Sequence, residues 1–244
     1  MSHRVCALAL LVIAGAANAQ INGVKIQERI FNDFPNSKLT TTNNFPALVQ
    51  FNETNFGLGT FANRHAAYFS TDGGANAKDF NYGDAFDVSF TLDLDATPAN
   101  GREAGFHVNS GGDYGFFGVL PNGEIAAFGG SLPFFSAGAG VWTPGAEVQL
   151  RLVHTPGDGT AANPSVMDYM YNTGSGWVTV SKNFDNAEFG LVTANNVLIG
   201  FGVQNQGGPG GSSNALFTNI VVPAPSALAM MGVAGLVASR RRRA

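Results

Sequence analysis

Few side chains in this 244-residue sequence are of the kinds that carry out acid–base or metal chemistry. Asp93 and Asp95 alternate with apolar residues, and paired carboxylates are the usual machinery of glycoside hydrolysis. Both follow the polar side of their segment, so solvent-facing polarity is the simpler interpretation. His65, His107 and His154 lack the His-x-x-x-His spacing of a zinc site. The sequence therefore shows no recognisable hydrolytic or zinc motif.

Two polar segments are candidates for binding an ion. Asp72, Asn76, Asp79 and Asp84 share one stretch with three glycines, and Ca²⁺ prefers oxygen ligands on flexible loops. Their spacing is not that of an EF-hand, so an ordinary polar loop is the alternative. The basic pair Arg64-His65 precedes a predicted strand and could bind an anion, although surface polarity explains it equally well. The sequence therefore predicts Ca²⁺ as a candidate cofactor and no other.

Aromatic residues offer a second kind of binding surface, because sugar rings stack on exposed aromatic faces. The pairs Phe116-Phe117 and Phe134-Phe135, together with Trp142 and Trp177, exceed what strict alternation along a strand would bury. The alternative is that adjacent phenylalanines cover opposite faces of one strand. We name Trp142 and Trp177 as the candidates for stacking on a glycan.

The elements that must position these residues are strands. From Ala85 to Asp95, five apolar residues alternate with Asp, Ser and Thr, which is the period of a half-buried strand. Asn122-Gly123 is a strong signal for a hairpin turn. The predicted strands are Val24–Phe31, Ala47–Phe51, Ala66–Ser70, Ala85–Asp95, Glu103–Val108, Tyr114–Leu120, Glu124–Phe128, Glu147–His154, Val166–Tyr171, Trp177–Ser181, Val197–Gln204 and Ala215–Val221. They predict an all-β fold, an antiparallel two-sheet sandwich or jelly roll.

The two ends of the chain read as targeting segments. Residues 1–19 have a basic start, an apolar run and the sequence Ala17-Asn18-Ala19, typical of a secretory signal peptide cleaved by signal peptidase before Gln20. The run is shorter than the ~20 residues that span a bilayer as a helix. Cys6, the single cysteine, lies inside this segment, so the mature chain has no thiol. We therefore expect residues 20–221 to form the β-sandwich domain.

Residues 222–244 combine a proline element, a short apolar stretch and a basic end. Pro223-Ala224-Pro225 fixes an extended linker, and residues 227–239 are expected to enter the membrane as a short transmembrane helix. By the positive-inside rule the basic end stays cytoplasmic; it consists of Arg240, Arg241, Arg242 and Arg243.

This order of parts resembles the PEP-CTERM sorting signal of exported bacterial proteins. Pro223 and Pro225 match the two prolines of that family, whereas Ala224 stands where the family has Glu. The resemblance implies an exosortase-type membrane protease or transpeptidase as partner. It also implies a transient inner-membrane anchor with the C-terminus cytoplasmic, then delivery to the cell surface or extracellular matrix. A plain tail anchor is the alternative.

The segment between the ends is similar in pattern to a concanavalin A-like lectin/glucanase (laminin G-like) jelly roll. The similarity rests on Phe31–Phe34, Ser70–Gly74, the Asn122-Gly123 hairpin, Val148–Leu152 and the closing strand Ala215–Val221. It implies that the first and last strands lie together in one sheet. Glycosidases of this family carry a Glu-x-Asp-x-x-Glu string. Because this chain has none, we predict that it is not an enzyme.

Charge completes the functional prediction. Without the two ends, eight Lys and Arg stand against 17 Asp and Glu, which leaves a net charge of −9. Such a domain repels polyanions such as DNA and favours neutral or cation-bridged glycans. We predict a structural or adhesive protein of the cell surface or matrix that binds exopolysaccharide or another glycan, and no nucleic acid. The alternatives are a secreted carbohydrate-active enzyme of the same fold and a stably membrane-anchored surface domain.

Overall fold

The computed structural model describes residues 20–56, 61–81, 83–95, 101–110, 113–158, 160–184, 197–206 and 211–222. Residues Ile21–Val222 form one compact unit. The predicted signal peptide with Ala17 and Ala19, and the predicted sorting signal with Pro223, Ala224, Pro225, the helix 227–239 and Arg240–Arg243, lie outside the described residues. Within the described ranges, no helix has the length and hydropathy needed to cross a bilayer.

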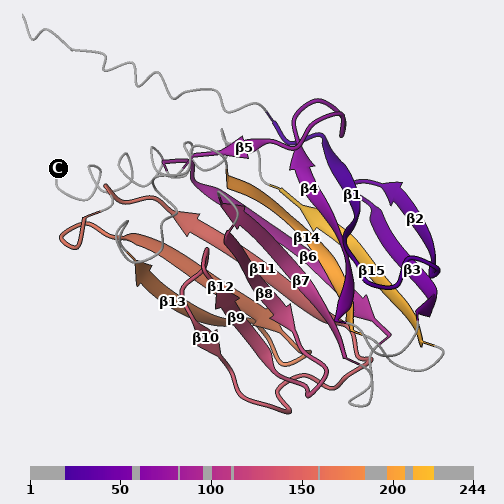
Figure 1. Ribbon diagram of the computed structural model, residues 1–244. Coiled ribbons are helices and arrows are strands. Elements are labelled where there is room, and N and C mark those ends of the chain that lie inside the picture. The colour runs from indigo at the N-terminus through magenta and orange to yellow at the C-terminus, as the bar shows by residue number, and fades with distance from the viewer. Residues whose placement is uncertain are drawn as a thin grey trace, which may run out of the picture. The chain divides into compact units, whose positions relative to one another are not determined.

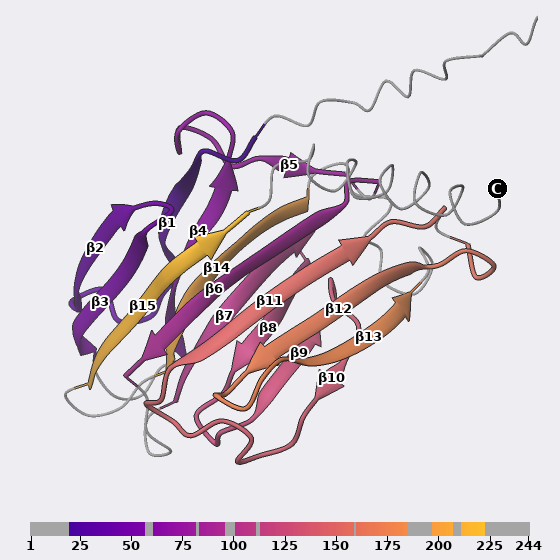
Figure 2. The same ribbon diagram turned by 180° about the vertical axis from the view of Figure 1, so that it is seen from behind.

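All regular elements of the described residues are strands, in two antiparallel sheets (Figure 1), which confirms the predicted all-β sandwich. Sheet A contains, in spatial order, β1 (Gly23–Asn32), β4 (Ala62–Ser70), β14 (Val197–Gln206), β7 (Arg102–Ser110), β8 (Asp113–Val119), β9 (Ile125–Gly129) and β10 (Phe135–Ser136), with β5 (Asp79–Phe80) also paired to β14. Sheet B contains β13 (Val178–Phe184), β12 (Ser165–Asn172), β11 (Val148–Thr155), β6 (Phe86–Leu94), β15 (Gly211–Val221), β3 (Leu48–Phe56) and β2 (Lys38–Asn44), a row that can be followed in Figure 2.

The core lies between the two sheets and is rich in phenylalanine. Phe90 of β6 contacts Phe106 of β7, with ring centroids 4.5 Å apart, and also Phe201 of β14, at 5.4 Å. Phe217 of β15 completes the cluster at 5.2 Å from Phe90. All four side chains are buried. Since neighbouring residues of a strand point to opposite faces, the residues next to Phe106 and Phe201 point away from sheet B.

Two expectations about the strands need correction. The first and last strands do not lie together: β1 pairs with β4 in sheet A, whereas β15 lies between β6 and β3 in sheet B. The hairpin of β2 and β3 follows β1 and occupies the place beside β15. Strand β2 was not predicted, because its sequence from Lys38 to Asn44 contains one apolar residue and forms a sheet edge.

A buried carboxylate joins the sheets at one end. Glu53 of β3 accepts hydrogen bonds from Ser37 Oγ (2.6 Å), Asn63 Nδ2 (2.6 Å) and Asn205 Nδ2 (2.8 Å). It also contacts His65 Nε2 at 3.0 Å, and Arg29 Nη1 lies 3.8 Å from it. Because the backbone N–H of Arg29 donates to His65 Nδ1, Nε2 is the nitrogen that carries the proton and donates to Glu53. Asn205 Oδ1 is buried without a hydrogen-bond partner among the described residues, but four side chains of the protein bond directly to Glu53, so we assign the cluster a structural role.

Candidate functional site

The outer face of sheet A, the face turned away from sheet B, has a floor of very small residues. Ala66, Gly202, Gly105, Gly118 and Ala126 are successive cross-strand neighbours on five strands, and we call them the small-residue row. A Cβ added at Gly105 would lie 2.3 Å from the Phe117 carbonyl oxygen, and one at Gly202 would lie 2.1 Å from the His65 carbonyl oxygen. The neighbouring backbones therefore leave no space for side chains at these two positions.

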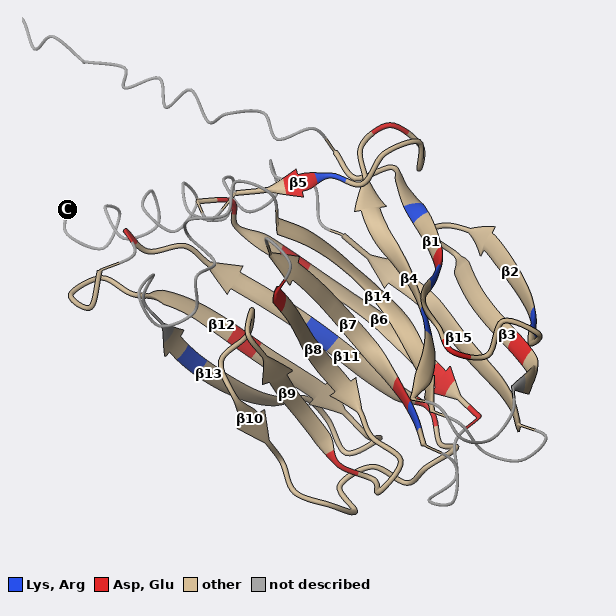
Figure 3. Ribbon diagram, in the orientation of Figure 1, with Lys and Arg blue, Asp and Glu red and all other residues tan. Residues whose placement is uncertain are grey.

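A hydrogen-bonded row of three polar side chains runs beside this floor. Arg64, Gln204 and Glu103 are directly opposite one another on β4, β14 and β7. Arg64 donates from Nε (2.8 Å) and Nη2 (2.6 Å) to Gln204 Oε1, and Gln204 Nε2 donates to Glu103 Oε1 at 2.7 Å. All three are buried. Few Lys and Arg residues lie on the strands (Figure 3), and among the described ones Arg64 and Arg102 are buried.

Arg64 also contacts a side chain from a distant strand on the same face of sheet A. Its guanidinium carbon lies 3.6 Å from the centroid of the Tyr114 ring and 4.1 Å from that of Phe31. Tyr114 belongs to β8, three strands away from β4. Along the strands, two rows of residues lie between them: the small-residue row and the row that contains His107. Arg64 and Tyr114 thus close over this part of the face.

Two side chains at this closure, His107 and Tyr114, carry polar atoms that have no hydrogen-bond partner among the described residues. Both ring nitrogens of His107 and the hydroxyl of Tyr114 are buried and unpaired, although the two rings contact each other with centroids 5.3 Å apart. Each unpaired buried polar group costs about 1–3 kcal/mol. Three such atoms close together destabilise the fold, and a site for a polar ligand would explain why they are present.

Burial sets the protonation of these groups. It holds the pKa of His107 well below the usual range, and the positive charge of Arg64 acts in the same direction. Burial raises the pKa of Tyr114. Both side chains are therefore neutral over the ordinary pH range. Glu103 is different: burial raises its pKa to about 7, against the opposing effects of Arg64 and of its hydrogen bond with Gln204.

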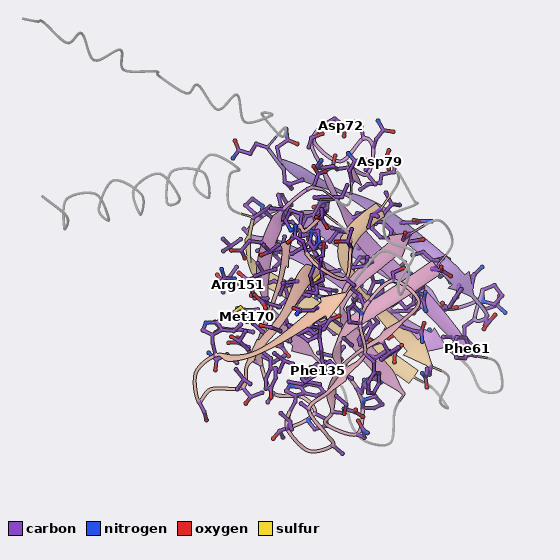
Figure 4. All side chains as sticks on the ribbon, turned by 90° about the vertical axis from the view of Figure 1, so that its left-hand side faces the viewer. Phe61, Asp72, Asp79, Phe135, Arg151 and Met170 are labelled. Carbon is purple, nitrogen blue, oxygen red and sulfur yellow. The ribbon has the colours of Figure 1, made fainter. Side chains whose placement is uncertain are left out.

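Of the four predicted calcium ligands, Asp72 and Asn76 contact each other directly, and calcium binding stays a prediction. Asp72 accepts hydrogen bonds from Ser70 Oγ and from the backbone and side-chain nitrogens of Asn76, and these bonds lower its pKa. Asp84 accepts from the Asn81 backbone nitrogen and lies 3.7 Å from Lys78 Nζ. Asp79, at the same end of the molecule as Asp72 (Figure 4), is on β5. No three His, Cys, Asp or Glu in the described part of the chain could hold a metal.

The two predicted stacking residues differ from each other. Trp142 is 1% exposed and donates from Nε1 to the Ala146 carbonyl. Because its ring is part of the core, neither face is available to a sugar. Trp177 is 44% exposed and precedes β13, and its role stays a prediction. Phe116 and Phe117 are both fully buried and cover opposite faces of β8, as the alternative interpretation holds.

The candidates at Asp93 and Asp95 are exposed, in agreement with simple polarity. The basic residue of the Arg64-His65 pair, in contrast, is not a surface group: Arg64 is 7% exposed and belongs to the polar row. Sequence reasoning missed Gln204, Glu103 and Tyr114. A weak signal did exist, since each is a polar side chain inside an otherwise apolar or glycine-rich strand.

No protein-family model and no curated protein sequence matches this chain. Similar solved structures do exist. A variant of the family 7 alginate lyase A1-II′ in complex with its substrate superposes with a TM-score of 0.53 at 13% identity, covering 83% of this chain and 93% of the lyase. The fold is a concanavalin A-like jelly roll. A second structure of that lyase, a member of polysaccharide lyase family 7, gives a TM-score of 0.50 at 12% identity, covering 75% of this chain and 82% of the lyase.

This finding corrects the prediction that the chain is not an enzyme. The prediction rested on the absence of a Glu-x-Asp-x-x-Glu string, which speaks only against hydrolysis by paired carboxylates. Alginate lyases share this jelly roll, and a lyase breaks a glycosidic bond by elimination. The missing carboxylate pair therefore does not argue against an enzyme of this fold.

Proposed function

We propose that this jelly roll is a carbohydrate-active enzyme that cleaves an acidic polysaccharide by elimination on the outer face of sheet A. The observation that carries the proposal is the pair His107 and Tyr114, whose three buried polar atoms have no partner in the described part of the chain, beside the buried cation Arg64. The alginate lyases of the same fold support it. Elimination needs one base, one acid and a group that neutralises the carboxylate of a uronate, and the face holds one residue suited to each.

The roles follow from charge and protonation. Arg64, with its side chain held by Gln204, is placed to bind the uronate carboxylate and so to acidify the adjacent C5–H. Neutral His107 has the free ring nitrogen of a base and takes that proton. The C4–O bond then breaks, the C4=C5 double bond forms, and the leaving oxygen takes the proton of the Tyr114 hydroxyl. Water then restores the two side chains by returning the proton from His107 to Tyr114.

Two features modify how a substrate arrives. His107 is fully buried beneath Arg64 and Tyr114, so these two side chains must separate for a sugar to reach it. The domain also carries a net charge of −9, which repels an acidic polymer at long range. That repulsion is screened beyond about 10 Å at 0.1 M salt, so close to the face the charge of Arg64 prevails.

The test is to incubate the purified protein with polymannuronate, polyguluronate, polyglucuronate and a neutral glucan. We expect an ultraviolet absorbance rise from the conjugated C4=C5 bond with at least one acidic polymer and none with the glucan. His107→Ala should reduce the rate by about 10²–10⁴-fold. Arg151→Ala is the matched control, because Arg151 pairs with Asp87 in sheet B, away from this site. Wild-type protein that releases no unsaturated product from any uronate polymer would refute the proposal.

We further propose that the protein is exported and sorted, as residues 1–19 and 222–244 predict. Signal peptidase would leave Gln20 as the first residue, and an exosortase-type enzyme would act at Pro223-Ala224-Pro225. Mass spectrometry of the protein from fractionated cells tests both steps. A full-length tail found only in membranes of cells that contain an exosortase would contradict the sorting step and favour a stable anchor.

A further inference from the structure

The polar row on sheet A contains a carboxylate whose presence the proposed elimination does not explain. Glu103 is 7% exposed and lies at the end of the row, one strand beyond Gln204 and two beyond Arg64. It accepts a hydrogen bond from a neutral amide, Gln204 Nε2. Burying an ionised carboxylate is costly unless it is paired and hydrogen-bonded, and the proposed elimination gives Glu103 no role.

The row links Glu103 to Arg64 without an ion pair between them. Gln204 is inserted between the two, accepting from the guanidinium with Oε1 and donating to the carboxyl group with Nε2. A carboxyl oxygen accepts that second bond whether or not Glu103 is protonated. The arrangement can therefore hold Arg64 in place in both protonation states, while the net charge of the row changes from +1 to zero when Glu103 ionises.

We propose that Glu103 is a charge switch for the Arg64 site, so that an acidic polysaccharide binds more tightly when Glu103 is protonated than when it is ionised. The inference rests on the proposed function, because it assumes that the ligand of Arg64 is a carboxylate. It adds a residue that regulates the site without contacting the reacting atoms.

The other groups that face Glu103 do not titrate where it does. Arg64 from β4 stays charged, and Gln204 from β14 has no ionisable group. Tyr114 from β8 and Tyr68 from β4 are neutral, since burial raises the pKa of each. His107, on the same strand, is held neutral by burial. The pKa of Glu103, raised by burial to about 7, therefore places the switch near neutral pH.

The sign and size of the effect follow from charge. Below the pKa the row is positive and attracts a uronate carboxylate, whereas above it the ionised Glu103 repels that ligand. If the carboxylates of Glu103 and of the bound uronate are ~8 Å apart at a partly screened site, full ionisation of Glu103 corresponds to about a five- to tenfold loss of affinity. The uronate itself stays ionised throughout, so the ligand contributes no pH dependence of its own.

The experiment measures binding of a fluorescently labelled polymannuronate oligosaccharide to the full protein between about pH 6 and pH 8. Because a group with a pKa of about 7 is about one-tenth ionised at pH 6 and about nine-tenths ionised at pH 8, wild type should lose affinity about three- to fivefold over this range. Glu103→Gln should keep the tighter value at every pH. Glu103→Ala repeats the test if the amide disturbs folding. Glu28→Gln removes an exposed carboxylate and is the control that should behave as wild type.

The outcomes separate this inference from the proposed function. A pH-independent wild type, or a Glu103→Gln protein that loses affinity as wild type does, overturns the switch while leaving the site intact. Failure of the wild type to bind this oligosaccharide at any pH, together with no cleavage of any uronate polymer, overturns the proposed function and the switch with it. If the switch operates, the affinity for a neutral glucan oligosaccharide should not change with pH, because that ligand has no charge for Glu103 to repel.

Discussion

Replacing Glu53 by Gln should destabilise the fold strongly at neutral pH and much less in acid. Its carboxylate receives hydrogen bonds from Ser37, Asn63, Asn205 and His65. Despite burial, which acts in the opposite direction, these bonds lower the pKa of Glu53 from 4.5 to about 2. An amide offers one acceptor oxygen in place of two and turns an NH₂ group toward the donors, so the variant cannot satisfy this cluster.

The magnitude follows from linkage between protonation and folding. A carboxyl group whose pKa is lower in the folded protein stabilises the fold above its unfolded pKa, and this stability disappears as the pH falls through the folded value. At about 1.4 kcal/mol for each tenfold difference in acidity, the change from 4.5 to about 2 corresponds to about 3 kcal/mol at pH 7. About 1.4 kcal/mol of it should remain at about pH 3.

Urea unfolding of wild type and Glu53→Gln at several pH values between about 7 and 3 measures this difference directly. We expect the difference in unfolding free energy to shrink by about half or more over that range. Glu28→Gln is the control, because Glu28 is exposed and accepts a hydrogen bond from Thr41 alone among the described side chains. A Glu53→Gln difference that is constant with pH, or below about 1 kcal/mol at neutral pH, would refute the linkage reasoning.

Three further changes test other parts of the structure. Phe61 is 59% exposed, and its ring lies 5.9 Å from that of Phe31, which contacts the Arg64 guanidinium. Phe61→Ala should weaken polysaccharide binding, as measured by affinity electrophoresis. Phe134→Ala, which removes another exposed phenylalanine beside β10, should not. Gly202→Ala should lower the melting temperature, because the new Cβ would meet backbone at 2.1 Å, whereas Gly83→Ala, with open space around it, should leave it unchanged. Tyr169→Phe removes a buried 2.8 Å hydrogen bond to a carbonyl and should cost about 1 kcal/mol in urea unfolding.

The sequence by itself determined the class of the fold. Alternation from Ala85 to Asp95 predicts which side chains of β6 enter the core, because the period of a strand depends only on its own backbone. Turn residues such as Asn122-Gly123 likewise act locally, and hairpins between successive strands could be anticipated from them. The prediction of an all-β sandwich therefore needed no knowledge of which strands pair across the sheets. Strand β2 escaped because its residues are mostly polar, so it has little apolar alternation to detect.

Only the tertiary structure decided which polar residues form a site. Arg64 and Gln204 are 140 positions apart, yet they are direct neighbours because β14 inserts between β4 and β7, an order that packing of the whole sandwich sets. The same order brings Glu103, His107 and Tyr114 to that face. Exposure is decided in the same way: of two similar tryptophans, one fills the core and the other faces solvent. Cross-strand contacts and burial are properties of the assembled sheets, so no local pattern in the chain encodes them.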